Sequence, residues 1–286
     1  MSAGSGTGTG AGTGTGTTPD RRPVPRIIAV GVAAAVLYVL IAAVVGALLD
    51  PLAGGDRTLD FVLGTWLPVG VLIVLGVLFL RRAGWLREAW TAPSPFTERR
   101  RWWLLAIPVV LLLQTVLLLL AVPWAERPLS MVLVYLVGCL LIGIGEETYF
   151  RGILRVSVRG HHGELTALLI TSIAFGLAHT VGYLLNGVPL PATALAVAFL
   201  AMDGALFYGV LRATGTLWVP IVLHGLGDFA RFLQDGGDDG SSTPGFGGDT
   251  TAALVEYLLI GLSIALVIST ARGDRRARRE RKATAA

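Results

Sequence analysis

Charged side chains are scarce in this 286-residue chain. Asp, Glu, Lys and Arg make up 15% of it, whereas an ordinary soluble domain carries about 25%. The mean hydropathy is +0.69, and the apolar residues gather in long runs. This composition argues against a soluble domain and predicts a polytopic membrane protein.

Cysteine is also nearly absent, since Cys139 is the only one. A single cysteine excludes an internal disulfide and a multi-cysteine zinc site. Large apolar side chains are almost missing from residues 1–20, a Gly, Thr and Ser tract. Such a tract buries too little surface to offset its ordering entropy, so we expect it to be disordered. We do not expect a signal peptide, because the first apolar run is too long and no cleavage site follows it.

The apolar runs predict an all-α fold, a polytopic membrane helix bundle of about eight transmembrane helices. A transmembrane helix needs about 20 predominantly apolar residues. The candidate spans are 27–49, 60–80, 103–122, 129–150, 165–185, 192–211, 216–233 and 252–271.

The distribution of Arg and Lys predicts the orientation of these spans. Of the 23 basic residues, 20 fall on one side of the membrane when the eight spans alternate. The side rich in basic residues faces the cytoplasm, so both termini are expected there. The same distribution explains the net charge of +4 without a nucleic-acid-binding face. The low-Lys composition, rich in Ala, Gly, Val and Arg, favours a multi-pass protein of a bacterial plasma membrane.

We divide the chain into five parts on this basis. They are a Gly/Thr-rich cytoplasmic tail (1–26), N-terminal helices with a basic cytoplasmic loop (27–122), a core (123–234), an acidic external loop with the last span (235–271), and a basic cytoplasmic tail (272–286). Within the basic loop, residues 82–101 mix Trp and Phe with Arg. They predict either an amphipathic helix in the membrane interface or a loop that only fixes the topology.

Ionisable residues at membrane depth are the strongest functional signal. Glu146, Glu147 and Arg151 end the apolar run that starts at Leu129. A charge at the bilayer centre costs about 2.5–3.5 kcal/mol on insertion scales, so such residues are rare and need partners. Two other spans offer partners at a similar depth: His179 in the fifth, and His224 with Asp228 in the seventh. We predict that these side chains converge on one polar site.

Helical spacing predicts how the groups pair. Glu147 and Arg151 are four residues apart and can form an ion pair, which leaves Glu146 free to face the histidines. His224 and Asp228 have the same spacing, and the carboxylate can fix the tautomer of the ring.

Each feature alone also has a purely structural interpretation, and the functional prediction depends on their combination. Asp203, in the sixth span, belongs to no motif. It is expected to cap the polar site or to bond a neighbouring helix, with a direct role as the less favoured alternative.

The ordered motifs resemble those of the CPBP family of intramembrane proteases, which includes type II CAAX prenyl endopeptidases and bacteriocin-immunity homologues. The family pattern is Glu-Glu-x-x-x-Arg, Phe-x-x-x-His and His-x-x-x-Asn or Asp on successive helices. The corresponding residues here are Glu146, Glu147 and Arg151, then Phe175 and His179, then His224 and Asp228. The resemblance covers roughly residues 129–233.

The resemblance implies an endopeptidase that hydrolyses peptide bonds inside the membrane. In this interpretation Glu146 activates water with help from His179, and His224 and Asp228 hold the oxyanion or a metal ion. Glu147 and Arg151 brace the site. The metal question stays open, because Glu146, His179 and His224 could bind Zn²⁺, yet no His-Glu-x-x-His motif is present.

Other classes of function use the same residues. A proton- or cation-coupled transporter would use buried Glu, His and Asp as a relay, but we find no internal repeat that indicates two related halves. A non-catalytic scaffold or immunity protein would not need Glu146. The partners expected of an endopeptidase are the lipid bilayer and a peptide or protein, which could be lipidated or membrane-embedded.

Overall fold

The computed structural model describes residues 23–92, 102–236 and 250–285, and over these residues the chain is almost entirely helical. The described part contains no strand and one isolated bridge, between Thr91 and Thr216. The predicted disordered tract 1–20 and most of the acidic loop lie outside the described residues. The all-α membrane fold predicted from the apolar runs is confirmed.

Helices follow one another along the chain with short connections. In order they are α1 (Ile28–Leu49), η1 (Asp50–Ala53), α2 (Arg57–Phe61), η2 (Val62–Trp66), α3 (Leu67–Ala83), α4 (Leu86–Trp90), η3 (Trp102–Leu105), α5 (Ala106–Leu120), η4 (Trp124–Glu126), α6 (Leu129–Glu147), η5 (Thr148–Leu154), α7 (Arg155–Arg159), α8 (Glu164–Ala178), α9 (Thr180–Leu185), α10 (Leu190–Thr214), α11 (Trp218–Gln234) and α12 (Thr250–Ala285).

Seven helical stretches of the described chain are long and apolar enough to cross a membrane, against about eight predicted. They are Ile28–Ala53, Arg57–Ala83, Trp102–Leu120, Leu129–Arg159, Glu164–Leu185, Leu190–Thr214 and Ala253–Thr284.

The remaining predicted span, 216–233, corresponds to α11, which has 17 residues. At 1.5 Å per residue this helix is about 26 Å long, slightly short of a hydrocarbon layer of about 30 Å. It also carries His224, Asp228 and Arg231. Its polar composition fits a helix that is covered by other helices of the bundle.

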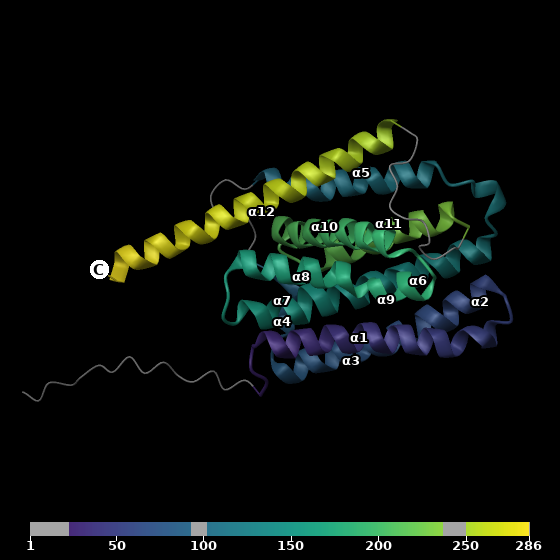
Figure 1. The fold of residues 1–286 in the computed structure, drawn as a ribbon, viewed down its shortest axis with the longest axis horizontal. Coiled ribbons are helices and arrows are strands. Elements are labelled where there is room, and N and C mark those ends of the chain that lie inside the picture. Colours follow the sequence, from purple (N-terminus) through teal and green to yellow (C-terminus); the bar gives the residue numbers. More distant parts are fainter. Residues whose placement is uncertain (1–22, 93–101, 237–249, 286) are drawn as a thin grey trace, which may run out of the picture.

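The bundle has a central group of helices between two outer pairs (Figure 1). Helices α5 and α12 lie along one side, α1 and α3 lie along the other, and α6, α8, α10 and α11 lie between them. The start of α1 and the end of α12 are at the same end of the bundle. If α11 crosses the membrane in addition to the seven candidate spans, the number of crossings is even, which places both ends of the chain on the same side.

Glycines allow α6 and α11 to pack closely in the centre. A Cβ atom on Gly143 would lie 2.5 Å from the Ile221 carbonyl oxygen, and one on Gly225 would lie 2.8 Å from the Cys139 carbonyl oxygen. Small residues at such crossings let two backbones approach. This contact sets the distance between the acidic end of α6 and His224 on α11.

Helix α12 continues through the predicted basic tail 272–286 as far as Ala285. Its end projects beyond the other helices in Figure 1. Asp274 on this extension accepts hydrogen bonds from the backbone N–H groups of Glu164 (3.3 Å) and Leu165 (3.0 Å). These are unpaired donors at the start of α8, so the α12 extension caps α8.

Part of the segment 82–101 is described, and it is not an exposed amphipathic helix. Trp85 is 0% exposed and packs edge-on against Phe79, with ring centroids 5.4 Å apart. Helix α4 has only 5 residues. Two features of the chain explain this: α3 ends at Gly84, whose φ is +69°, and the turn there directs Trp85 into the core. Residues 93–101 lie outside the described part.

Candidate functional site

The acidic end of α6 leads directly into a π-helical segment. Residues Thr148–Leu154 form η5, and all seven are buried. The wider π-helical turn is rare and often occurs at functional sites. It continues the span that began at Leu129 and carries Arg151 into the protein interior.

Glu147 and Arg151 form a fully buried ion pair. Arg151 Nη1 donates to Glu147 Oε1 at 2.8 Å, and both side chains are 0% exposed. Arg151 Nη2 donates to the Gly204 carbonyl oxygen on α10, also at 2.8 Å. The guanidinium lies 4.3 Å from the centre of the Phe175 ring. The predicted pair is present, and hydrogen bonding and a cation–π contact stabilise its cation.

His224 is held between carboxylates. Its Nδ1 faces Glu147 Oε1 at 3.1 Å, and its Nε2 faces Asp228 Oδ2 at 3.3 Å. A carboxylate oxygen only accepts, so each ring nitrogen that bonds one acts as a donor. Glu147 Oε1 therefore links the guanidinium of α6–η5 to the imidazole of α11.

Two aromatic rings fix the plane of His224. Phe207 of α10 is stacked on it, with ring centroids 4.5 Å apart and an interplanar angle of 16°. Phe175 of α8 approaches edge-on at 5.6 Å. The rings also shield the charges from lipid, so hydrogen bonds within the site act in a low-dielectric environment.

Glu146 and Glu147 each have a buried, unpaired Oε2, but only Glu147 is held through its other oxygen, by Arg151 and His224; no hydrogen bond to Glu146 is present in the described structure. The Oε2 of Glu146 lies 3.8 Å from His224 Nε2. Buried polar atoms are nearly always paired, so an unpaired one needs an explanation. The carboxylate oxygen is free to accept a proton or a hydrogen bond from a bound group.

His179 ends α8 and lies at the edge of the cluster. Its Nδ1 is 2.9 Å from the carbonyl oxygen of Phe175, which can only accept, so Nδ1 is the donor. In the neutral ring, Nε2 is then an acceptor. His179 is close enough to Glu146 for electrostatic interaction, although no direct bond joins them in the described structure.

The structure brings together the residues that the motifs select: Glu146, Glu147, Arg151, His224 and Asp228 are linked by direct contacts, and His179 adjoins them. Sequence analysis missed Phe207 and the backbone carbonyl of Gly204. Neither has a motif, but both lie in α10 within four residues of Asp203, the acid that remained unassigned. Asp203 interacts electrostatically with Arg151, His224, Asp228 and Arg231, which places it beside the cluster.

The candidate metal ligands do not form a metal site in this arrangement. Among the residues that the structure describes, no group of three or more His, Cys, Asp and Glu side chains could hold a metal ion. Both nitrogens of His224 already face carboxylates other than Glu146, at 3.1 and 3.3 Å. A three-ligand site of Glu146, His179 and His224 would need these contacts to rearrange.

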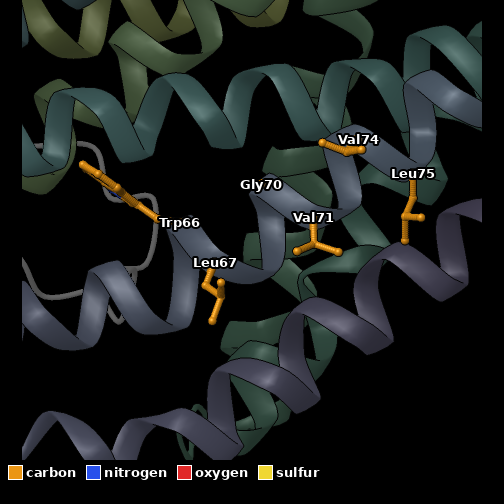
Figure 2. Close-up of a pocket in the computed structure, with 6 residues that line it drawn as sticks. All are labelled: Trp66, Leu67, Gly70, Val71, Val74 and Leu75. Atoms are coloured by element: carbon orange, nitrogen blue, oxygen red, sulfur yellow. The ribbon is translucent and has the colours of Figure 1, made fainter.

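An apolar pocket on the outer surface is separate from this cluster. It has a volume of about 400 Å³ and is lined by Trp66, Leu67, Gly70, Val71, Val74 and Leu75 (Figure 2). Leu67, Val71 and Leu75 are about half exposed. No ionisable group lines the pocket, so it fits contact with lipid rather than peptide chemistry.

The fold and the charge cluster define an integral membrane protein with an enclosed polar site. Residues 128–230 match the family model described as type II CAAX prenyl endopeptidase Rce1-like. These residues include every member of the three motifs, so the resemblance to the CPBP family is confirmed for this part of the chain. The match supports a CAAX-protease-like intramembrane endopeptidase in general. No curated protein and no solved structure matches the chain.

Proposed function

We propose that this protein hydrolyses peptide bonds within the membrane by means of water activated by Glu146. The observation that carries the proposal is the unpaired Oε2 of Glu146, buried beside an imidazole that two other carboxylates hold in place. A general base needs a free acceptor, and an electrophilic group needs a fixed orientation. Glu146 and His224 meet these two requirements.

In the proposed reaction, Glu146 takes a proton from water as the water oxygen bonds to the scissile carbonyl carbon. The carbonyl π electrons move to oxygen and produce an oxyanion. The C–N bond then breaks, and Glu146 returns the proton to the leaving amine. Water supplies the OH of the new carboxyl group, so the atoms balance without a further reactant.

His224 is proposed to stabilise the oxyanion. Its Nε2 faces Asp228 at 3.3 Å and lies 3.8 Å from Glu146, so a carbonyl oxygen bound between the two carboxylates would share this N–H with Asp228. Glu147 and Arg151 act indirectly by orienting His224. Glu147 accepts from Nδ1 of His224, and Arg151 in turn donates to the same oxygen of Glu147. His179, with Nδ1 bound to a carbonyl, presents Nε2 as an acceptor that orients the water.

The proposed substrate is a peptide or protein segment that reaches membrane depth, and a lipid modification could deliver it there. The site lies among transmembrane helices, so a water-soluble chain would have to leave the aqueous phase to reach it. The bacterial plasma membrane remains the expected location.

The test is cleavage of a panel of membrane-embedded and lipidated peptides by the purified protein in detergent. E146Q is expected to lower the cleavage rate by about 10²–10⁴-fold, the usual contribution of a general base. H179A is expected to lower it as well. The matched control is E256Q, because Glu256 is also an acid in a membrane helix but bonds Gln114 at 3.0 Å on the α5–α12 side.

Cleavage that survives both E146Q and H179A would remove the enzymatic proposal. We expect a chelator to leave the rate of the wild-type protein unchanged. Loss of cleavage with the chelator alone would instead show that a metal ion carries the reaction.

A further inference from the structure

Tyr38 is the one side chain with a polar atom among the 22 residues of α1. Helix α1 lies outside residues 128–230, which match the family model. The rest of the helix is built from Gly, Ala, Val, Leu and Ile, as expected of a lipid-facing span. Despite this setting, Tyr38 is only 4% exposed. A hydroxyl group is therefore carried from a lipid-facing helix into the protein.

The hydroxyl of Tyr38 lies beside the backbone that carries Glu146. A Cβ atom built on Gly145 would be 2.8 Å from Tyr38 Oη and 3.0 Å from Val69 Cγ1. Tyr38 also interacts electrostatically with Glu146 and Asp228. The missing side chain of Gly145 thus leaves room for the Tyr38 hydroxyl. Gly145 directly precedes Glu146, the proposed general base.

Tyr149 provides an internal comparison for Tyr38. The two rings are in contact, with centroids 4.6 Å apart and an interplanar angle of 35°. Tyr149 donates its hydroxyl to the Leu72 carbonyl oxygen at 2.9 Å. No hydrogen bond of the Tyr38 hydroxyl is present in the described structure, and its oxygen is not among the fully buried unpaired polar atoms. The hydroxyl of a buried tyrosine usually has a hydrogen-bond partner. The Tyr149 hydroxyl has one within the fold, whereas the Tyr38 hydroxyl bonds no protein group among the described residues and keeps some accessible surface.

We propose that Tyr38 donates a hydrogen bond to the scissile carbonyl oxygen as it becomes an oxyanion. This inference rests on the proposed function and adds a catalytic residue from outside the matched segment. As water oxygen bonds the carbonyl carbon and Glu146 takes the proton, negative charge develops on the carbonyl oxygen. The neutral phenol keeps its proton and stabilises that charge, together with His224 Nε2.

A donor role suits a phenol better than a base role. A neutral tyrosine offers one O–H donor, and an oriented donor in a water-poor site stabilises developing charge strongly. The base is already supplied by Glu146. With Tyr38, the site receives groups from α1, α6, α8 and α11 rather than from the matched helices alone.

The test compares Y38F with Y149F, because both remove one hydroxyl from neighbouring rings of equal size. Y38F is expected to lower kcat by about 10²-fold or more with little change in KM, as for the loss of an oxyanion donor. Its thermal unfolding temperature should stay near that of the wild type. Y149F is expected to show the opposite result, a lower unfolding temperature with kcat retained.

The outcomes separate this inference from the proposed function. If the wild type cleaves, E146Q does not, and Y38F keeps the wild-type kcat, the role of Tyr38 is overturned and the function stands. A higher KM for Y38F at unchanged kcat also overturns it, because the hydroxyl would then bind only the ground state. If E146Q cleaves as well as the wild type, the proposed function itself fails and this inference fails with it.

Discussion

Two Arg–Glu pairs of this protein lie in opposite surroundings. Arg151 and Glu147 have side chains that are both 0% exposed. Arg26 and Glu88, which tie the start of α1 to α4, have side chains that are 21% and 41% exposed. The chemistry of the two pairs is the same, and their burial differs completely.

The difference shows which pair the protein could lose at low cost. An exposed pair contributes about 0–1 kcal/mol, since water solvates both partners when they separate. A buried pair is often no more stabilising than well-packed apolar residues, because desolvation offsets the attraction. The Arg151–Glu147 pair is thus poorly explained by stability alone. Its contact with His224 at 3.1 Å gives it a second role, the orientation of the imidazole.

The largest effect is expected from R151M, which breaks the buried pair. It removes the guanidinium partner of the buried Glu147, and breaking a buried pair in this way costs about 3–5 kcal/mol. Thermal unfolding in detergent should show this loss, and peptide cleavage should be lost as His224 becomes disordered. The double variant E147Q/R151M should recover part of the stability but not the activity. Recovery of both would show that the pair is only structural.

A smaller effect is expected from G225A, which changes the backbone spacing and leaves every charge in place. The new Cβ would lie 2.8 Å from the Cys139 carbonyl oxygen, so α6 and α11 must move apart. Overpacking of this kind costs about 1–3 kcal/mol, and a longer distance from Glu147 to His224 should also lower the cleavage rate. The control is G261A, because nothing lies within 4 Å of a Cβ there. Equal behaviour of the two variants would contradict the role of the close crossing.

The smallest effect is expected from E88Q, which breaks the half-exposed pair. The cost should be at most about 1 kcal/mol, and the cleavage rate should equal that of the wild type. High salt should reduce the difference further, since exposed charges are screened. A loss as large as that of R151M would remove the contrast between the two pairs.

The sequence predicts contacts within one helix well. Glu147 with Arg151 and His224 with Asp228 each have a spacing of four residues, and both contacts are present. The convergence of separate spans was inferred from depth alone, which the limited length of a membrane helix makes possible. The contact of 3.8 Å between Glu146 and His224 agrees with that inference.

Contacts that depend on packing between helices could not be predicted in the same way. The acceptor at Gly204 is a backbone carbonyl, which every residue has, so the sequence does not mark it. A phenylalanine such as Phe207 is likewise ordinary in an apolar span. Tyr38 gave a usable signal, since a lone hydroxyl in a long apolar helix calls for a partner. The number of spans differs from the prediction because α11 has only 17 residues, fewer than any of the seven candidate spans, of which the shortest has 19.

The cap on α8 has a consequence for protein engineering. Because Asp274 accepts from the first amides of α8, the C-terminal extension of α12 is connected to the helix that carries His179. A truncation before residue 274, or a bulky fusion that bends this extension, would expose those amides and loosen this end of the helix bundle. Affinity tags are therefore better attached at the N-terminus.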